Sequence, residues 1–352
     1  MKLHYYPLIT KFKDPFTISG GRTKSEQSTL IVSLSLGNYT GWGEAPAISY
    51  YDISVEQMVA DLKDKKMFVE KFALTEPERY WHYLHHLFPK DPFLVCALDM
   101  ACWDLFGQLK GRPLYQLWET TWIENGPLTD YTIGLDAVDN MIRKIKATPW
   151  PIYKIKLGSP DDIGNIKALR AVTDAPFRVD VNGGWTLAEA LEKIPQLKKL
   201  GVTFIEQPLP RAQQPSDWTD MKTLYEASTL PLIADESCVF ELDVEKCKGY
   251  FHGINIKLTK CSGPTPALRM IRQARDLGLT VMMGSMNETA IGSAAIAHFL
   301  PQLDEVDMDG ILLLERPGAT GLSIEKGVVS VSGAPGLGIR PDFSLPDQQY
   351  SG

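Results

Sequence analysis

The feature that most limits what this sequence can fold into is a run of eight short apolar segments alternating with amphipathic stretches. The run begins near Tyr131, and each unit is about 25 residues long. This alternation is typical of a parallel sheet, because a parallel pairing needs a helical crossover between its strands. Eight strands of this kind predict an α/β fold with a parallel barrel. The predicted strands cover residues 131–134, 152–157, 177–181, 203–208, 232–237, 253–258, 280–285 and 304–309.

The two ends of the sequence follow other patterns. The first ~110 residues read as a strand meander followed by helices, which is an α+β pattern. From about Ile311 the chain reads as extended, and "GLSIEKGVVSVSG" predicts a hairpin that folds back onto the N-terminal region. The predicted N-terminal elements are strands at 2–10, 28–36 and 39–44 and helices at 54–66, 76–87 and 92–108.

Charge and hydropathy argue against two classes of partner. The formal net charge is −7 and no long block of Lys and Arg occurs, so we expect no nucleic acid and no anionic membrane surface as partner. No segment approaches the ~18 apolar residues of a membrane span. The longest candidate, "FLVCALDMACWDLFG", is interrupted by Asp99 and Asp104. A small-molecule substrate is the expected partner, and the composition is compatible with a homo-oligomer.

The cysteines indicate a reducing compartment. There are five of them, none in a C-x-x-C pair, and an odd number suits free thiols better than a disulfide framework. The N-terminus "MKLHYYPLITKFKD" lacks the apolar core of a signal peptide. We therefore expect a cytoplasmic protein.

Polar residues recur at the C-terminal ends of the predicted strands. Successive members are 22 to 29 residues apart, which matches the strand–helix unit. Active sites of β/α barrels lie at this end of the strands, so we expect these side chains to share one site. They are Lys156, Asp180, Glu206, Asp235, Lys257, Ser285 and Asp307.

Three acids end three successive strands. Asp180, Glu206 and Asp235 would converge at the barrel mouth, where carboxylates repel each other unless a cation lies among them. Oxygen ligands without Cys or His favour Mg²⁺ or Mn²⁺ over zinc. A lone acid at a strand end more often caps the next helix or pairs with a surface lysine. Three acids at the ends of three successive strands favour a metal site over these alternatives. Asn182 and Glu236 lie beside two of the acids and could support them.

Three lysines accompany the acids. Lys154 and Lys156 lie two apart in one strand and so share a face, and Lys257 comes from a strand four positions further round. An ammonium beside a second ammonium and a divalent cation has a lowered pKa, so it can act as a general base. Lys156, nearer the strand end, is the predicted base of the pair, with Lys154 lowering its pKa. The alternative is an edge strand with two solvated lysines.

These residues together define a reaction class. A metal that binds a carboxylate, with a base on each face of its α-carbon, permits α-proton abstraction through an enediolate. A proton that leaves from one face and returns to the other gives racemisation or epimerisation.

At these residues the sequence resembles the enolase superfamily, and within it the muconate-lactonising-enzyme subgroup. The matching motifs are "KIK" (154–156), "DVNGGW" (180–185), "IEQP" (205–208), "ADES" (234–237) and "NIKLTK" (255–260). The resemblance implies a modified TIM barrel, (β/α)7β, at 126–317. It also implies an α+β capping domain at 1–125 that is completed by about 318–352. For the site it implies Mg²⁺ on Asp180, Glu206 and Asp235 with lysine bases at Lys156 and Lys257.

The stretch "DMDG" (307–310) bears on the substrate. Asp307 and Asp309 resemble the signature of dipeptide epimerases, in which two carboxylates hold the ammonium of the N-terminal residue. A solvated turn is the alternative. In "TISGGRTKSE" (17–26), Arg22 and Lys24 could meet an acidic side chain, as in L-Ala-D/L-Glu from peptidoglycan turnover, or form an ordinary exposed basic loop. Ser285 and Glu288, in "MGSMNETAIG" (283–292), should line the same pocket.

We therefore expect a Mg²⁺-dependent dipeptide epimerase, an isomerase with L-Ala-D/L-Glu as the expected substrate. Alternatives on the same scaffold are a cycloisomerase, an o-succinylbenzoate synthase, an N-acylamino acid racemase and an acid-sugar dehydratase. A catalytically inactive barrel used for binding would lack a metal ligand or a base, whereas all five positions are filled here.

Overall fold

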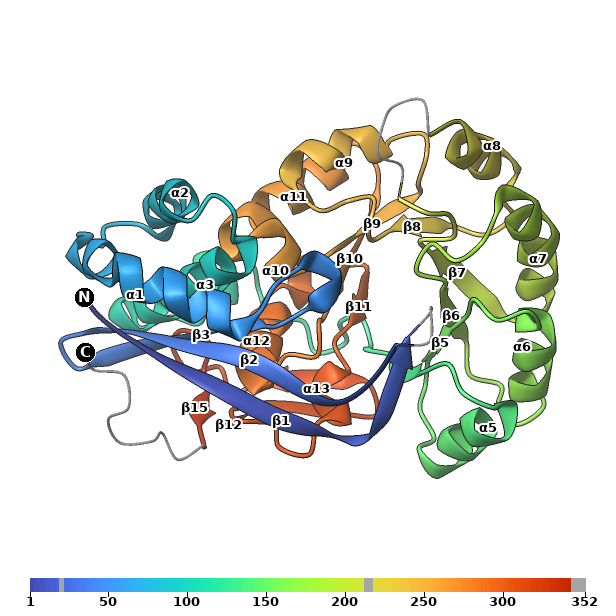
Figure 1. Ribbon diagram of the computed structural model, residues 1–352, viewed down its shortest axis with the longest axis horizontal. Coiled ribbons are helices and arrows are strands. Elements are labelled where there is room, and N and C mark those ends of the chain that lie inside the picture. Colours follow the sequence, from blue (N-terminus) through green and yellow to red (C-terminus); the bar gives the residue numbers. More distant parts are fainter. Residues whose placement is uncertain (19–21, 212–217, 343–352) are drawn as a thin grey trace.

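The computed structural model describes residues 1–18, 22–211 and 218–342. Figure 1 shows two parts side by side: an N-terminal sheet with helices packed against it, and a barrel of strands surrounded by helices. The N-terminal strands are β1 (Lys2–Ile18), β2 (Arg22–Leu36) and β3 (Tyr39–Pro46), which pair antiparallel in that order. The helices that follow are α1 (Val55–Lys71), α2 (Pro77–Leu87), α3 (Pro92–Lys110) and α4 (Leu114–Leu117).

The predicted strands of the barrel are all present. In the described part of the chain they form one eight-stranded parallel sheet in sequence order. Thr129, which precedes the first of these strands, bridges Val306 in the last, so the two edges of the sheet meet. The strands are β4 (Tyr131–Ile133), β5 (Tyr153–Lys156), β6 (Phe177–Asp180), β7 (Val202–Glu206), β8 (Leu232–Ala234), β9 (Gly253–Ile256), β10 (Thr280–Gly284) and β11 (Glu305–Asp307).

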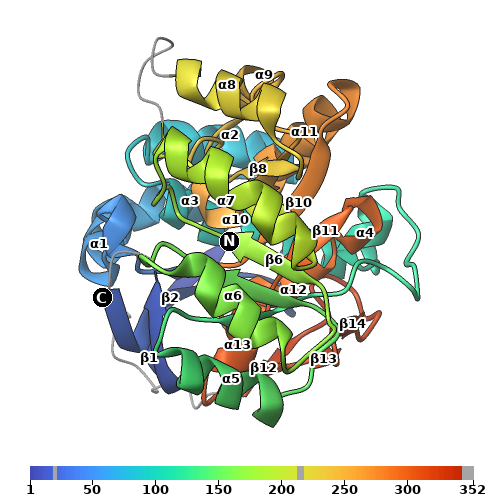
Figure 2. The ribbon, with the colours of Figure 1, turned by 90° about the vertical axis from the view of Figure 1, so that its right-hand side faces the viewer.

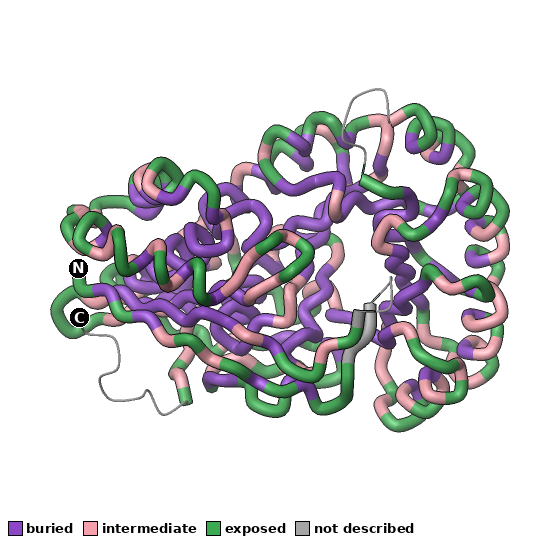
Figure 3. Tube along the Cα trace, viewed as in Figure 1, coloured by how far each residue is buried: buried purple, intermediate pink, exposed green. Residues whose placement is uncertain are grey.

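Helices connect each barrel strand to the next, which confirms the predicted (β/α)7β architecture. Figure 2 shows several of them lying over the outside of the strands. Figure 3 shows buried strands within a ring of helices whose outer faces are exposed. The helices are α5 (Val138–Ala147), α6 (Asp162–Arg170), α7 (Leu187–Lys199), α8 (Thr219–Ala227), α9 (Glu241–Cys247), α10 (Leu258–Cys261), α11 (Pro264–Asp276), α12 (Ala290–Ala297) and, after β11, α13 (Gly310–Leu313).

The apolar core has two main clusters. One contains only residues between Leu3 and Leu105, and the other is built mainly from the barrel and its helices. Helix α3 contributes to both. By length and composition it could cross a membrane, but 72% of it is buried inside the protein. It is therefore the central helix of this fold.

The C-terminal segment contacts both parts of the molecule. The predicted hairpin is present as β13 (Leu322–Glu325) and β14 (Val328–Val331), and β12 (Ala319–Thr320) pairs with β15 (Arg340–Pro341). The Leu337 amide donates to Asp104 of α3 at 2.8 Å, and the Glu315 amide donates to the Lys11 carbonyl at 2.8 Å. These contacts agree with a tail that folds back, while the domain limits at 125 and 317 remain a prediction.

Candidate active site

Five charged side chains from five neighbouring strands meet at the C-terminal end of the barrel. The sheet order runs from β5 to β9 without interruption, so the three acids lie between the two lysines. Register places Lys156 beside Asp180, and Asp180 beside Glu206. In strand order the five are Lys156 at the end of β5, Asp180 at the end of β6, Glu206 at the end of β7, Asp235 after β8 and Lys257 after β9.

The three acids can share one cation. Asp180, Glu206 and Asp235 each place a carboxylate oxygen within 4.8 Å of the others, and all three are buried. Oε2 of Glu206 lies 2.8 Å from Nζ of Lys154, and the same ammonium is 3.1 Å from Asp180. Burial and the neighbouring Asp180 raise the pKa of Glu206 to about 7. A cluster of three buried carboxylates, which supplies hard oxygen ligands and no Cys or His, fits Mg²⁺.

The two outer acids are held in their charged form by lysines. Burial by itself raises the pKa of Asp180, but Lys156 and Lys154 outweigh it, so this pKa lies below its usual range. Burial also raises the pKa of Asp235, but Lys257 and Lys260 outweigh burial, so this pKa too lies below its usual range. Two of the three metal ligands are therefore carboxylates over the whole working pH range.

Lys156 and Lys257 lie at opposite ends of the acid trio. Nζ of Lys156 is 2.6 Å from Oδ2 of Asp180, and Nζ of Lys257 is 2.7 Å from Oδ2 of Asp235. Each lysine is 8% exposed, so each ammonium reaches the barrel mouth from an otherwise buried stem. A small substrate above the acids would have one amine on each side.

In the metal-free protein, the carboxylates raise the pKa values of Lys257 and Lys154. Burial lowers the pKa of Lys257, but Asp235 and Glu206 outweigh burial and raise it above its usual value. The pKa of Lys154 is raised in the same way, by Asp307, Glu206 and Asp180 against burial. A cation on these carboxylates would cancel much of this effect.

Lys154 is more deeply buried than a residue that removes a substrate proton should be. Its Nζ is 2.6 Å from Asp307, 2.8 Å from Glu206 and 3.1 Å from Asp180, and the residue is 2% exposed. Lys154 and Lys156 both contact Oδ2 of Asp180, as expected for side chains on one face of a strand. Because three carboxylates enclose its ammonium, Lys154 links the metal ligands to Asp307 and does not face a substrate.

Asp307 and Asp309 have different surroundings. The Asp307 side chain is 8% exposed and faces Lys154. Both oxygens of Asp309 accept hydrogen bonds from Thr132, at 2.5 Å from its amide and 3.1 Å from its hydroxyl. Burial and the nearby Asp307 raise the pKa of Asp309 to about 7. Of the two, Asp307 is better placed to meet an ammonium.

Asp307 and Asp309 belong to a second acid cluster. Asp130 completes it, with one oxygen of each residue within 4.8 Å of the others. Cationic side chains already pair with two of its three acids: Lys154 pairs with Asp307, and Arg178 donates to Asp130 at 2.8 Å. Sequence reasoning missed Arg178, although it lies two residues before Asp180 on the same face of β6.

The remaining predicted site residues are more scattered. Ser285 is half-buried after β10, and its amide donates to the Asp307 carbonyl at 2.8 Å. Glu288 is buried beside Glu44 of β3, and burial and Glu44 raise its pKa to about 7. It belongs to neither acid cluster found among residues 1–18, 22–211 and 218–342. Lys24 is half-buried in β2. The Arg22 side chain lies outside the described residues.

Several supporting residues were missed or only partly foreseen. Asn255 donates to Oε1 of Glu206 at 2.8 Å, and its place two residues before Lys257 on β9 was a usable signal. Lys260 binds the Asp235 carboxylate and also its main-chain carbonyl, at 2.6 Å. Asn182, foreseen as a support, accepts from Lys156 at 3.3 Å and donates to Glu236 at 3.2 Å.

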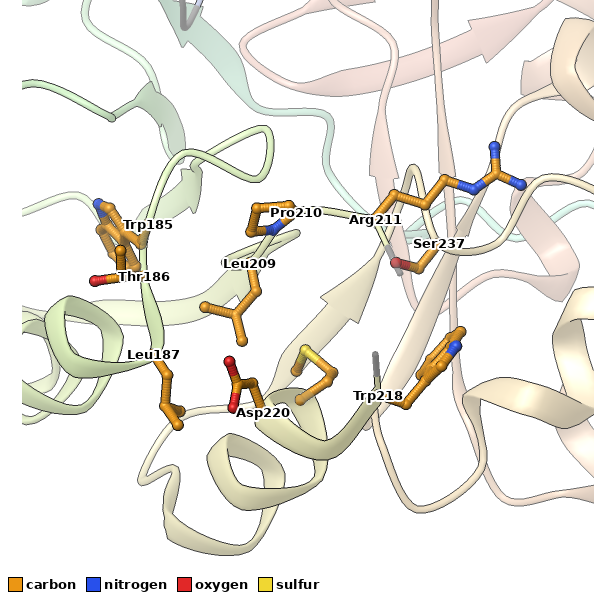
Figure 4. Close-up of a pocket in the computed structure, with 10 residues that line it drawn as sticks. Trp185, Thr186, Leu187, Leu209, Pro210, Arg211, Trp218, Asp220 and Ser237 are labelled. Atoms are coloured by element: carbon orange, nitrogen blue, oxygen red, sulfur yellow. The ribbon is translucent and has the colours of Figure 1, made fainter. Parts of the chain in front are cut away.

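A cavity of about 340 Å³ lies beside this site. Its lining comes from the segments that follow β6, β7 and β8, and Figure 4 shows the side chains gathered around it. The lining is largely apolar, with Trp185, Leu209 and Trp218 among its members. The metal-site acids are absent from the described lining, so this cavity is separate from the point where the acids converge.

Comparison with known proteins identifies the family. A family model described as "Enolase C-terminal domain-like" matches residues 136–345, which is more than half of the chain. This chain belongs to the enolase C-terminal domain-like family. The predicted superfamily is therefore confirmed.

Relatives of this enolase-family protein are epimerases. An L-Ala-D/L-amino acid epimerase from Flavobacterium johnsoniae is 46% identical over 339 residues, which cover 96% of this chain and 99% of the relative. The predicted isomerase class is confirmed by this relative. The fold matches the substrate-liganded L-Ala-D/L-Glu epimerase from Bacillus subtilis with a TM-score of 0.89 at 28% identity, covering 96% of this chain and 99% of the other.

A further solved structure carries a metal. The dipeptide epimerase from Enterococcus faecalis V583, in complex with Mg and the dipeptide L-Leu-L-Tyr, matches with a TM-score of 0.85 at 28% identity. The alignment covers 96% of this enolase-family chain and 98% of the other.

Proposed function

We propose that this protein is a Mg²⁺-dependent dipeptide epimerase that inverts the α-carbon of the C-terminal residue of its substrate. The observation that carries the proposal is the order of side chains across β5 to β9: lysine, three acids, lysine. This order places an amine at each end of a site built for a divalent cation. The epimerases among its relatives and structural neighbours support the same reaction.

The metal site would be formed by Asp180, Glu206 and Asp235. Bound Mg²⁺ would supply positive charge to the substrate carboxylate and so make the adjacent α-proton more acidic. Nζ of Lys156 removes that proton from one face of the α-carbon, and Nζ of Lys257 returns a proton to the other face. In the reverse direction the two lysines exchange roles. Lys260 and Asn255 hold Asp235 and Glu206 in place through the hydrogen bonds described above.

The charges near β11 support a substrate with a free amino group. Burial raises the pKa of the Asp307 carboxylate, but Lys154 together with Lys257 and Lys156 lowers it below its usual range, so it stays ionised. An α-ammonium offers three donors to such an acceptor. We propose dipeptides that begin with L-Ala as substrates, with L-Ala-D/L-Glu as the first to test, in line with the relatives named above.

The cellular setting is part of the same proposal. L-Ala-D/L-Glu is a peptide of peptidoglycan turnover, so we propose a role in the metabolism of such peptides. All five cysteines are free and buried, which supports a reducing compartment such as the cytoplasm.

The test is incubation with Mg²⁺ and L-Ala-L-Glu in D₂O, followed by NMR and chiral analysis. We expect deuterium at the α-position of the C-terminal residue together with inversion of its configuration. L-Ala-L-Leu in a parallel reaction shows whether an acidic side chain is needed. A cycloisomerase, an o-succinylbenzoate synthase or a dehydratase would leave both dipeptides unchanged, and that outcome would refute the proposal.

A further inference from the structure

Gln207 follows the metal ligand Glu206 and is almost completely buried, at 1% exposure. All of its side-chain polar atoms are engaged. Oε1 accepts from the amides of Asp235 and Ser237, both at 3.1 Å. Nε2 donates to the Leu209 carbonyl at 2.8 Å and to the Ser237 hydroxyl at 2.9 Å. Two backbone donors face one end of the amide and a carbonyl faces the other, so its orientation is fixed.

The main chain of Gln207 extends the same connections. Its amide donates to the Ile233 carbonyl in β8 at 2.9 Å. Its carbonyl accepts from the Gly183 amide, three residues after Asp180, at 2.8 Å. One residue therefore connects the strand or loop of every metal ligand: the loop after β6, the end of β7 and the segment after β8.

The backbone of Gln207 is unusual for its residue type. Its φ is +37°, in the left-handed region that residues with a side chain seldom adopt. Such strain persists where the surrounding structure holds it, and it clusters at functional sites. Glycine would relieve the strain, but glycine has no side chain with which to hold Asp235 and Ser237.

We propose that Gln207 is a positioning residue of the metal site: it fixes the segments after β6 and β8 relative to Glu206, so that the three acids meet at one ion. This inference rests on the magnesium site of the proposed function. Gln207 binds neither metal nor substrate, and it acts through the backbone amide of Asp235.

Magnesium affinity of the metal-free protein tests this role directly. Gln207→Met keeps the length of the side chain and removes all four hydrogen bonds. Gln27→Met is the matched control, because Gln27 is also buried, at 2%, and donates to the carbonyls of Ser28 and Ala47 at 2.7 and 3.0 Å, away from the acids. Thermal unfolding reports the stability lost in each variant, and calorimetric titration with Mg²⁺ alone reports the Kd.

We expect Gln207→Met to weaken Mg²⁺ binding at least about 10-fold, as is usual for residues that orient metal ligands, while Gln27→Met stays within about twofold of the wild type. If Gln207→Met binds Mg²⁺ as tightly as the wild type does, the positioning role is refuted and the proposed function stands. If Gln207→Met does not fold, Gln207→Asn decides, since it stays neutral and tolerates a positive φ, but its shorter side chain withdraws the acceptor from the Asp235 amide. Unchanged affinity there refutes the role, and weaker affinity supports it. No Mg²⁺ binding by the wild type would refute the metal site and this inference together.

Discussion

The Asp307 carboxylate pairs with Lys154 and is also placed to bind the ammonium of a substrate. Oδ2 accepts from Lys154 at 2.6 Å, and 8% of the side chain remains exposed. Because Lys154 holds it in the ionised form, it can receive a substrate ammonium without first losing a proton. A neutral side chain at this position would keep the shape and lose most of the attraction.

Asp307→Asn should therefore raise KM for free dipeptides about 10- to 100-fold, because a hydrogen bond to a charged group contributes about 1.5–3 kcal/mol. Steady-state kinetics with L-Ala-L-Glu measures the change. N-acetyl-L-Ala-L-Glu, which has no ammonium, is the control. Its KM should differ much less between the variant and the wild type. An unchanged KM for the free dipeptide would exclude ammonium recognition by Asp307.

Residues on the barrel strands were predictable because the strand–helix unit repeats. Lys156, Asp180, Glu206 and Asp235 fall at equivalent places in successive units, so spacing alone brought them together. Lys260 was not predictable in this way, because it reaches Asp235 from the short helix α10. The pKa directions of the lysines also depend on how closely the carboxylates pack, which spacing does not show.

Carboxylates of the N-terminal part bind the starts of two barrel helices. Glu44 of β3 accepts from the amides of Thr289 and Gly292 at α12, and from the Thr29 hydroxyl at 3.0 Å. Asp99 of α3 accepts from the Thr265 amide and hydroxyl at α11, both at 2.8 Å. Carboxyl oxygens at helix N-termini satisfy backbone amides that have no partner within the helix. These contacts fix the N-terminal sheet relative to the barrel.

Glu44→Gln should destabilise the protein by about 2 to 3 kcal/mol, because the amide NH₂ would replace an acceptor and face buried donors. The free energy of unfolding in urea measures this. Glu56→Gln, at an exposed position in the first turn of α1, is the control and should change stability by less than about 0.5 kcal/mol. Equal stability of the two variants would show that Glu44 does not hold α12.

Asp99 should make stability depend on pH. Burial raises its folded-state pKa from 3.8 to about 8, against the hydrogen bonds from Thr265 that lower it. Between these values the folded protein binds a proton that the unfolded chain has released, so stability falls as pH rises. The Asp99→Asn variant lacks this titration. Relative to the wild type, its free energy of unfolding should therefore increase by more than about 1 kcal/mol from about pH 5 to about pH 8. A pH-independent difference between the two proteins would contradict the raised pKa.

The strands of the barrel matched their predicted positions closely, because apolar runs between turn signals mark buried parallel strands. The N-terminal strands were harder to delimit. The pairing of β1 with β2 continues to Ile18 and Arg22, through a register shift between Lys11 and Phe16. These outer residues are largely polar and pair through the backbone, so the hydrophobic pattern does not reveal them.

For the molecule as a whole, the metal should add to stability. Three buried carboxylates within 4.8 Å repel each other in the metal-free protein, and burial together with Asp180 and Asp235 raises the pKa of Glu206. A cation that binds only the folded state stabilises it by about 2.7 kcal/mol at a concentration 100 times its Kd.

Mg²⁺ should therefore raise the Tm of EDTA-treated protein by about 3 to 6 °C. Differential scanning calorimetry at constant ionic strength measures the shift. Glu206→Gln removes one ligand charge and should reduce the shift. The same Tm with and without Mg²⁺ would argue against a site formed by the three acids.

The arrangement of the two parts was predictable only in outline. The tail shows a hairpin pattern in the sequence, but its contacts with α3 arise from single polar residues such as Asp104, which accepts from the amides of both Trp42 and Leu337. Contacts between residues so far apart in sequence leave no periodic signal, so they emerge only from the folded chain.

Two opposed lysines are the core of the proposed mechanism, and stereospecific exchange tests them most directly. Lys156→Ala and Lys257→Ala are incubated with Mg²⁺ in D₂O, once with L-Ala-L-Glu and once with L-Ala-D-Glu, and α-deuteration is followed by NMR. Lys246→Ala, a surface substitution, is the control and should behave as the wild type does. Each catalytic variant should lose epimerisation by about a thousandfold or more. Each should still exchange the α-proton of one diastereomer, a different one in each variant. Equal loss of exchange from both diastereomers in both folded variants would contradict the mechanism.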